Sequence, residues 1–239
     1  GFGVIFTVRE AMKHLGIDPT TTSAAIQGFG NVAQYAAIGF RQFLGGKVVC
    51  VSCWDRGDKK AYTFCKEEGV DPMFLMSITD QYGTINKVKA KEAGYIIEDG
   101  DSWISKDVDV LIPAALEGQV TADSVKKISK KVKILAEAAN GPTTPEADAV
   151  LEQNGVFVIP DFLCNAGGVT VSYFEGVQND QNFYWGRDEV FERLNHKMTD
   201  AFKSVLDMSL SKKVCMRDAA YMVSIDKVVK AMRLRGWIS

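Results

Sequence analysis

The chain has 239 residues, of which 46% are hydrophobic and 24% are charged, and its formal net charge is -2. This composition is typical of a globular protein, and the slight negative charge argues against nucleic-acid binding, which needs many Lys and Arg residues to neutralise phosphates. No apolar run approaches the roughly 20 residues that span a bilayer, so we expect no membrane partner.

Short apolar runs alternate with amphipathic runs over the first two thirds of the chain. Residues 2–15 have the apolar spacing of a helix, which Gly16 ends. An apolar strand, a helix and a second strand follow within about 30 residues, the usual size of a βαβ unit. We predict strands at 23–27, 47–52, 109–112, 133–136 and 156–159, and helices at 31–44, from Pro72, and from Pro145 to Leu151.

This alternation predicts an α/β fold with a doubly wound, mostly parallel Rossmann-type sheet. Residues 80–107 are polar and weakly patterned, and we expect an irregular excursion there. Helical patterns dominate after Asn165, and residues 177–239 form a mainly helical C-terminal part. We expect residues 1–239 to form a single NAD(P)-binding domain.

A glycine-rich run joins the predicted strand at 23–27 to the helix that follows it. Its spacing, Gly28-x-Gly30-x-x-Ala33, fits the G-x-G-x-x-G/A fingerprint of dinucleotide-binding proteins. The first glycine permits a tight turn, the second lets the backbone approach a pyrophosphate, and the helix N-terminus supplies free N–H groups. We therefore expect a cofactor-binding turn made of Gly28, Phe29, Gly30, Asn31 and Val32.

Cofactor choice depends on an acidic residue about 20 positions after the glycine turn, which hydrogen-bonds the ribose of NAD. That spacing falls on Cys53, and Asp55 and Arg56 follow it. Asp55 can reach the ribose and repel the 2′-phosphate of NADP, whereas Arg56 can attract that phosphate. The order of these residues favours NAD, because the acid precedes the arginine, and it leaves NADP open.

Five cysteines lie at irregular spacing, which is typical of reduced thiols in the cytoplasm, and no signal peptide is visible. Cys50 and Cys53 spell C-x-x-C, the spacing of redox and zinc sites. Residues three apart in a strand point to opposite faces, so we expect no redox or metal site from this pair. The two histidines also lack the spacing of metal ligands.

Several further runs occur in the order in which one enzyme family has them. They are QGFGNVA (27–33), IPAAL (112–116), AEAANGPTT (136–144), IPDFLCNAGGV (159–169) and SYFE (172–175). Together they resemble the cofactor-binding domain of glutamate dehydrogenase, in the family that also acts on leucine, phenylalanine and valine. The resemblance covers essentially the whole chain. It implies a reversible, NAD(P)-dependent oxidation of L-glutamate to 2-oxoglutarate and ammonia.

The resemblance also implies roles for particular residues. Ala114 and Ala115 would lie beside the ribose and the nicotinamide of the cofactor. Asn140 would contact the nicotinamide-side ribose, and Asn165 would lie by the nicotinamide and the reacting substrate, although either asparagine can instead serve only a turn or a helix cap. A serine hydroxyl facing the substrate can donate to the carboxylate of glutamate. The substrate-facing residues would be Gly168, Val169 and Ser172.

Two positions depart from the family pattern. Gly118 stands where the family usually has asparagine, and Gly176 stands where it commonly has tryptophan. We expect one polar contact and some bulk near the cleft to be missing. A glycine inside a helix also costs about 1 kcal/mol relative to alanine.

The resemblance places the catalytic lysine and aspartate of the family in a separate substrate domain, N-terminal to this one, and no segment of this chain matches them. We therefore expect no catalytic residue in the chain, which would bind NAD(H) and need the missing substrate domain to oxidise glutamate. Two alternatives stay open: a leucine- or phenylalanine-type dehydrogenase domain, and a stand-alone nucleotide-binding module without catalysis.

The terminal run, residues 217–237, has an amphipathic pattern. In the family this last helix returns toward the substrate domain. Without that partner the helix would either pack on its own domain or leave an exposed apolar face, and self-association through that face is a hypothesis. The expected buried stripe consists of Ala220, Val223, Val228, Ala231 and Met232.

Overall fold

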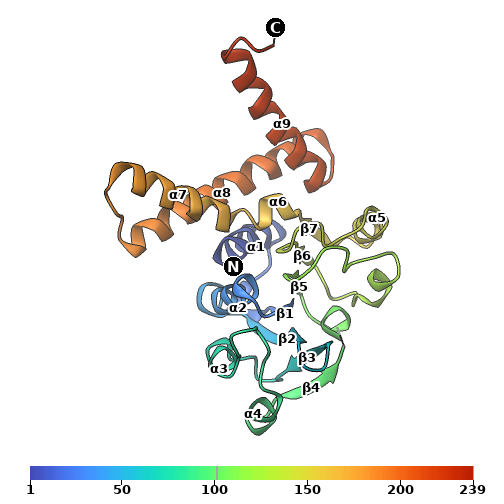
Figure 1. The fold of residues 1–239 in the computed structure, drawn as a ribbon. Helices are drawn as coiled ribbons and strands as arrows, with labels where there is room; N and C mark the ends of the chain where they lie inside the picture. Colours follow the sequence, from blue (N-terminus) through green and yellow to red (C-terminus); the bar gives the residue numbers. More distant parts are fainter. Residues whose placement is uncertain (101, 239) are drawn as a thin grey trace.

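A computed structural model describes residues 1–100 and 102–238 of the chain (Figure 1). Within these ranges, one sheet of seven strands has the order β4-β3-β2-β1-β5-β6-β7. The predicted doubly wound and mostly parallel sheet is confirmed. The parallel strands are β1 (Ser23–Gln27), β2 (Lys47–Asp55), β5 (Val110–Pro113), β6 (Ile134–Ala136) and β7 (Phe157–Ile159).

The central strand β1 is buried along its whole length. One face of the sheet packs against α1 (Phe2–Leu15) and α2 (Asn31–Leu44). The other face packs against α5 (Pro145–Gln153) and the 3₁₀ turns Ser102–Ser105 and Ser124–Lys127. Because both faces are covered, β1 reads SAAIQ, without the polar alternation of a strand that has one side in water.

Two helices begin where the sequence predicts. Asp71 accepts hydrogen bonds from the amides of Met73 and Phe74 and so starts α3 (Pro72–Ser77). Thr144 caps α5 in the same way. Each of these helices has proline in its first turn, where a backbone N–H has no helical partner to lose.

The segment after β2 is more regular than its sequence suggests. The chain turns back from β2 into β3 (Lys60–Cys65), and β4 (Ile96–Asp99) adds a second antiparallel strand at the edge of the sheet. α4 (Lys87–Glu92) precedes β4, and the 3₁₀ turn Ser102–Ser105 follows it, so the expected irregular excursion at 80–107 is wrong. β4 is an edge strand with no fully buried residue, so its sequence has no clear apolar pattern.

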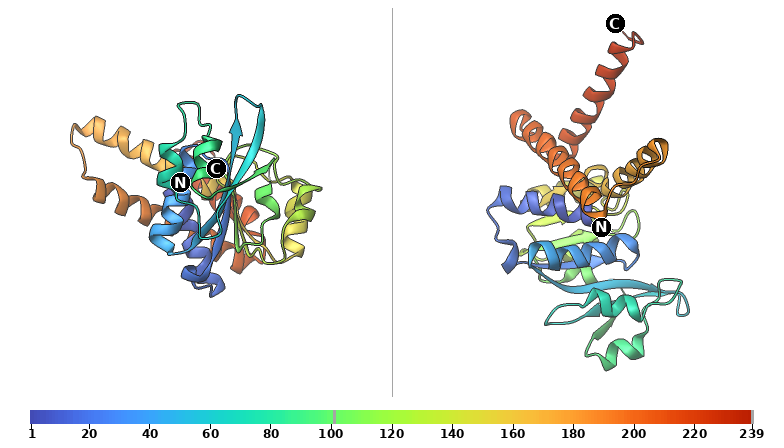
Figure 2. Two further views of the ribbon diagram at one scale, coloured as in Figure 1. Left: turned by 90° about the horizontal axis from the view of Figure 1, so that it is seen from below. Right: turned by 90° about the vertical axis from the view of Figure 1, so that its left-hand side faces the viewer.

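In the described residues, four helices follow the sheet, as the helical pattern of the C-terminal part predicts. α6 (Asp161–Cys164) leads into α7 (Gly167–Gln181) and α8 (Arg187–Lys212), which form a two-helix arm. α9 (Met216–Leu234) projects separately from the body (Figure 1). The right-hand view in Figure 2 shows the arm and α9 at the end of the molecule opposite α4.

Only the first turns of α9 pack against the rest of the structure. Ala220 is buried and Val223 is half-buried, whereas Val228 is 59% exposed. Ala231 is exposed and Met232 is half-buried, so the predicted buried stripe is wrong beyond Val223. Amphipathic spacing indicates that a helix has an apolar face, but it does not indicate that the chain has a surface to cover that face.

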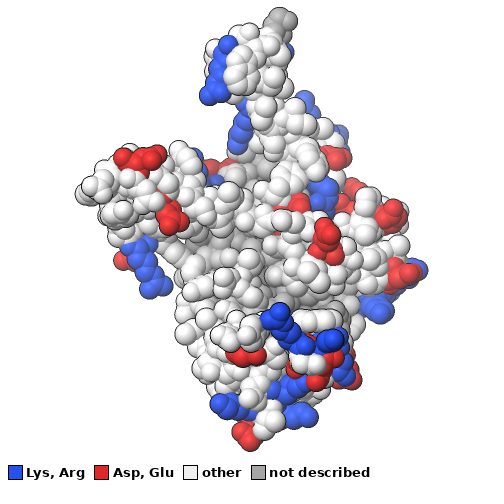
Figure 3. All heavy atoms as spheres, viewed as in Figure 1, with Lys and Arg blue, Asp and Glu red and all other residues white. Residues whose placement is uncertain are grey.

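The surface carries charges of both signs. On the face shown in Figure 3, Lys and Arg mix with Asp and Glu near α4 and β4, and a largely uncharged band lies below the α7–α8 arm. Within the described ranges no helix has both the length and the apolar character needed to cross a bilayer.

Candidate functional site

A cavity of about 690 Å³ opens where the chain leaves β1 and β5. These strands are neighbours, but the sheet continues from β1 to β2 on one side and from β5 to β6 on the other. Turns that diverge in this way leave a crevice at the carboxyl edge of a parallel sheet, and this crevice is the usual ligand site of the architecture. The cavity is lined by the turns after β1 and β5, the end of β2 and residues 82–83.

The turn after β1 needs glycine at position 28 for reasons internal to the protein. Gly28 has a φ of 90°, and a Cβ atom added to it would lie 3.1 Å from the carbonyl oxygen of Ala114. Its N–H donates to Oγ of Ser52 at 3.1 Å. The turn is held further by Gln34, whose Nε2 donates to the carbonyl oxygen of Phe29 at 2.8 Å.

Gly30 has no such internal requirement. A Cβ atom added to Gly30 would meet no atom within 4 Å, so the bare backbone there faces open space. Gly30 is the N-cap of α2 and has no side chain to cap the first helical amides. Asn31 and Val32 follow at this N-terminus and are exposed. Free amides, the positive end of the helix dipole and unfilled space together fit an anionic ligand such as a pyrophosphate.

The end of β2 brings Cys53, Trp54 and Arg56 to the cavity, but not Asp55. The carboxylate of Asp55 pairs with Nζ of Lys87 at 2.7 Å and accepts a hydrogen bond from the amide of Asp58 at 2.9 Å. The hydrogen bond from Lys87 lowers the pKa of Asp55. Lys87 lies on α4, in the segment whose sequence shows no pattern, so this engagement of Asp55 has no signal in the sequence.

Cys53 lies at the position that the spacing rule assigns to a ribose-binding acid. Its thiol is buried and donates to the carbonyl oxygen of Gly83 at 2.9 Å. Burial raises the pKa of Cys53 to about 11, so this group is neutral near pH 7. The guanidinium carbon of Arg56 lies 4.8 Å from the ring centre of Tyr82. This end of the cavity therefore has aromatic surfaces and one cation.

Trp54 and Tyr82 are cavity residues that sequence reasoning missed. Trp54 is 59% exposed beside the end of β2, and its place directly before Asp55 was a usable signal. Tyr82 reaches the cavity from a loop that follows α3, and nothing in its sequence surroundings indicates this.

The structure also brings together the two asparagines that the family resemblance singles out, although neither is among the residues that line the cavity. The carbonyl oxygen of Pro113 accepts hydrogen bonds from the amides of Ala138 and Ala139, which ties the loop after β6 to the end of β5. Beyond this tie, Nδ2 of Asn165 donates to Oδ1 of Asn140 at 2.8 Å. Ala114 and Ala115 line the cavity from the same strand end as Pro113.

The residues expected to face the substrate lie on the exposed side of α7. Gly168, Val169 and Ser172 are all exposed, and Val169 is 70% exposed. The N-terminus of α7 is set close against α1, because a Cβ atom on Gly3 would lie only 2.7 Å from Cα of Gly167. These side chains therefore continue from Asn165 along a surface that no described residue covers.

The two departures from the family pattern have different settings. Gly176 lies inside an unbroken α7 and is exposed, with no atom within 4 Å of an added Cβ. Gly118 has a φ of 62°, and its N–H donates to the carbonyl oxygen of Gly141 at 2.9 Å. The turn around Gly118 is thus joined to the loop that carries Asn140.

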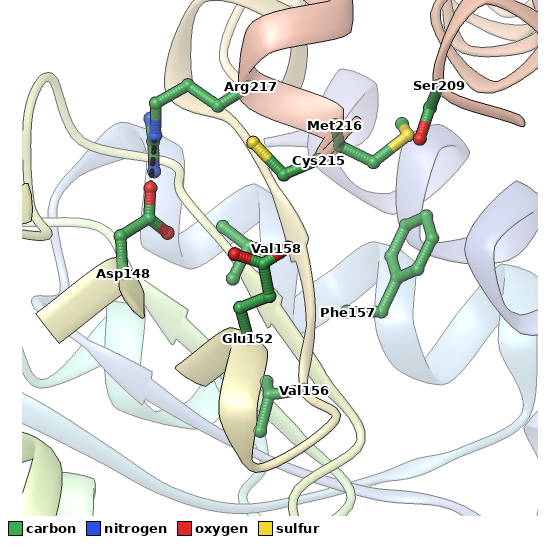
Figure 4. A pocket seen from close by; sticks show the side chains of 9 residues that line it. All are labelled: Asp148, Glu152, Val156, Phe157, Val158, Ser209, Cys215, Met216 and Arg217. Atoms are coloured by element: carbon green, nitrogen blue, oxygen red, sulfur yellow. Dashed lines mark hydrogen bonds and ion pairs between the residues drawn. The ribbon is translucent and has the colours of Figure 1, made fainter. Parts of the chain in front are cut away.

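A second, smaller pocket of about 220 Å³ lies between α5, β7 and the start of α9 (Figure 4). Figure 4 shows Arg217 reaching from α9 to Asp148, and Nε lies 2.6 Å from the carboxylate.

Arg217 also donates to both carboxylate oxygens of the fully buried Glu137, at 2.7 and 2.9 Å. Glu137 in turn accepts from the amide of Asp161, and Asp161 accepts from the amide of Gly141. This network fixes the loops that carry Asn140 and Asn165.

The sequence model of the Glutamate/Leucine/Phenylalanine/Valine dehydrogenase family matches residues 1–236. The chain belongs to this family. It is similar to the NAD-specific glutamate dehydrogenase of Clostridioides difficile, at 44% identity over 238 residues, and to the glutamate dehydrogenase of Thermotoga maritima, at 43% over 236 residues. The crystal structure of glutamate dehydrogenase from Peptoniphilus asaccharolyticus matches the fold with a TM-score of 0.81 at 39% identity.

The chain spans about half the length of these dehydrogenases. The two sequence matches cover 99% of this chain and 54% of each relative. The structural match covers 100% of this chain and 53% of the other chain. The sheet, the glycine turn and the helical arm therefore correspond to one part of these longer relatives.

Proposed function

We propose that this chain is the dinucleotide-binding part of a dehydrogenase that reversibly oxidises L-glutamate to 2-oxoglutarate and ammonia with NAD+, and that residues 1–239 act as one binding domain. One observation carries the proposal: Gly30 presents bare backbone and the uncapped N-terminus of α2 to a cavity at the β1–β5 switch point. The relatives named as glutamate dehydrogenases support the choice of reaction.

In this proposal different residues bind the pyrophosphate, the adenosine and the nicotinamide of the cofactor. The amides of Gly30, Asn31 and Val32 bind the pyrophosphate, because they lie at the positive end of the helix dipole. Trp54 and the Arg56–Tyr82 pair receive the adenosine end, where flat rings and a cation are available. When bound, the nicotinamide supplies the hydride chemistry, and the residues proposed to orient it are Ala114, Ala115, Asn140 and Asn165.

We propose NAD as the cofactor, supported by relatives from Clostridioides difficile and Peptoniphilus asaccharolyticus that are named NAD-specific. The residues that line the cavity do not clearly favour NAD over NADP. Its described lining has Arg56 and no carboxylate, because Asp55 is paired with Lys87. NADPH therefore belongs in every binding test of this chain.

The exposed face of α7 supports glutamate as the substrate. Ser172 can donate a hydrogen bond to a side-chain carboxylate, which leucine and phenylalanine lack. We propose that the substrate clamp and the general base come from the part of the longer relatives that this chain does not cover. The chain alone would then bind the cofactor without oxidising glutamate. The rival function is a nucleotide-binding module without catalysis.

Calorimetric titration of the purified chain with NADH and then NADPH tests the proposal. We expect saturable NADH binding that Gly30→Val abolishes, because its branched side chain fills the space beside the α2 amides. Gly186→Val is the matched control, since Gly186 also has open space around it but lies at the start of α8. Absence of NADH binding, or binding that Gly30→Val leaves unchanged, would overturn the proposed site.

A turnover assay tests whether the chain oxidises glutamate by itself. Glutamate and NAD+ are mixed with the purified chain, and NADH formation is followed by its absorbance. We expect no rate above background. A clear rate would contradict the proposal that base and clamp lie elsewhere, and it would leave the binding site intact.

A further inference from the structure

Two cysteines from different strands stand directly opposite each other in the sheet. The antiparallel pairing of β2 with β3 places Cys50 across from Cys65. The amide of Lys66 donates to the carbonyl oxygen of Val49 at 3.0 Å, so the adjacent pair, 49 and 66, is a hydrogen-bonded pair. Cys50 and Cys65 therefore form a non-hydrogen-bonded pair, in which opposite Cα atoms are about 4.5 Å apart. That separation lies within the range that a disulfide bridges.

The C-x-x-C spacing in the sequence pairs Cys50 with Cys53 instead. Cys53 lies on the opposite face of β2 from Cys50, in the core layer of α1 and α2, and its thiol is engaged with Gly83. Cys50 and Cys65 share the layer that contains Trp103. The sheet thus pairs Cys50 with a cysteine fifteen residues further along the chain.

The two thiols differ in access and in acidity. Cys50 is fully buried, whereas Cys65 is partly exposed. A hydrogen bond between the thiols lowers the pKa of Cys65 and raises the pKa of Cys50. The ammonium of Lys106 lowers the pKa of Cys65 further. Glu98 pairs with Lys106 at 2.6 Å and accepts a hydrogen bond from Sγ of Cys65 at 3.6 Å, and its negative charge opposes this shift. A partly exposed thiol with a lowered pKa and a buried thiol opposite it is the arrangement of a reactive cysteine and its resolving partner.

We propose that Cys50 and Cys65 form a reversible redox site, in which hydrogen peroxide oxidises Cys65 and Cys50 then closes a cross-strand disulfide. The Cys65 thiolate attacks one peroxide oxygen: an S–O bond forms, the O–O bond breaks, and hydroxide leaves and is protonated to water. The Cys50 sulfur then attacks the sulfenic sulfur. An S–S bond forms, the S–O bond breaks, and the hydroxide leaves with the Cys50 proton as a second water. Two thiols are oxidised and one peroxide is reduced.

The disulfide would join β2 to β3 just before the strand end that carries Cys53 and Trp54 to the cavity. It closes a loop between positions 50 and 65 and so restricts the unfolded chain, which raises the melting temperature of the oxidised protein. The site does not depend on what the cavity binds. The test of the redox site is therefore independent of the test of the proposed dehydrogenase function.

Peptide mapping tests the site directly. The folded chain is treated with one equivalent of hydrogen peroxide, denatured in iodoacetamide and cleaved with trypsin, which releases peptides 48–56 and 61–66. We expect these peptides linked, two hydrogens lighter than their sum, with Cys53 alkylated in the fragment spectrum. A dithiol reductant should restore the separate peptides. The oxidised chain should melt several degrees higher than the reduced chain.

Three variants sharpen the outcome. Cys53→Ser should leave the link intact, and Cys65→Ser should abolish it and leave Cys50 open to alkylation after unfolding. Lys106→Met should slow the peroxide reaction several-fold, because less Cys65 is ionised. Recovery of Cys65 as sulfinic acid with Cys50 alkylated, or a link made through Cys53, would overturn the proposal. So would an unchanged rate in Lys106→Met.

Discussion

Asn165 donates a hydrogen bond from Nδ2 to Oδ1 of Asn140 across 2.8 Å. The two residues follow different strands, and each comes from a run that resembles the dehydrogenase family. Their contact joins the loop after β6 to the short helix after β7. It lies at the carboxyl edge of the sheet, where the turn after β5 also carries Ala114 into the cavity.

This contact predicts coupled effects on cofactor binding. Asn140→Ala and Asn165→Ala should each weaken NADH binding about three- to tenfold, the worth of one or two hydrogen bonds. The double variant should lose less than the product of the two, because each residue orients the other. Calorimetric titration of the four proteins measures the coupling. Asn179→Ala, on the exposed far part of α7, is the control, and strictly multiplicative losses would contradict the coupling.

Substitutions at the two glycines of the turn should affect different properties, with Gly28 important for stability and Gly30 for cofactor binding. Gly28→Ala should lower the free energy of unfolding by about 1–3 kcal/mol, because its φ is positive and Ala114 is close. Gly30→Ser should keep or slightly raise stability, since serine is a good N-cap. It should weaken NADH binding, because the hydroxyl competes for the α2 amides. Urea unfolding and NADH titration of both variants check this, and equal stability losses would count against it.

The ion network at Glu137 should be important for stability. Arg217→Met leaves a fully buried carboxylate without its partner and should cost about 3–5 kcal/mol in urea unfolding. Arg193→Met removes an exposed pair with Glu189 and should cost less than about 1 kcal/mol. Adding Glu137→Leu to Arg217→Met should recover part of the loss. A loss of unfolding free energy in Arg217→Met no larger than in Arg193→Met would contradict this prediction.

Stability at low pH should depend on Lys87. The ion pair holds the pKa of Asp55 below its ordinary value of 3.8. The pair therefore stabilises the fold above that pH, and this stability is lost as the pH falls through the lowered pKa. Lys87→Met should make the loss of stability between about pH 4 and 2 shallower and should lower stability at neutral pH. Lys89→Met, exposed on the same helix, should behave like the parent chain in urea titrations across this range.

The uncovered part of α9 predicts self-association of the isolated chain. Ile225 and Val228 are each 59% exposed on a projecting helix. Burying such residues against a second copy removes apolar surface from water. Light scattering should show a mass that rises with concentration, and Val228→Lys should reduce the rise. Lys227→Ser is the control beside it. A strict monomer at high concentration would contradict the prediction.

Much of the fold could be predicted from local sequence. The run SAAIQGFGNVA by itself indicates a buried strand, a glycine turn and a helix, because small apolar residues, a positive φ and an uncapped helix start each leave a local signature. The parallel strands and the starts of α3 and α5 were found in the same way. β3, β4 and α4 were missed. An edge strand and a six-residue helix bury too little to impose a pattern, and β3 buries only its three central residues.

The sequence alone determined the fold class, the glycine turn and the family to which the chain belongs. Only the tertiary structure decided which side chains meet. It turned Asp55 toward Lys87 and away from the cavity, set Cys50 against Cys65 rather than Cys53, joined Asn140 to Asn165, and left α9 projecting. The physical reason is that turns and strands are set by neighbouring residues. Contacts between residues far apart depend on sheet register and on which surfaces the folded chain has available.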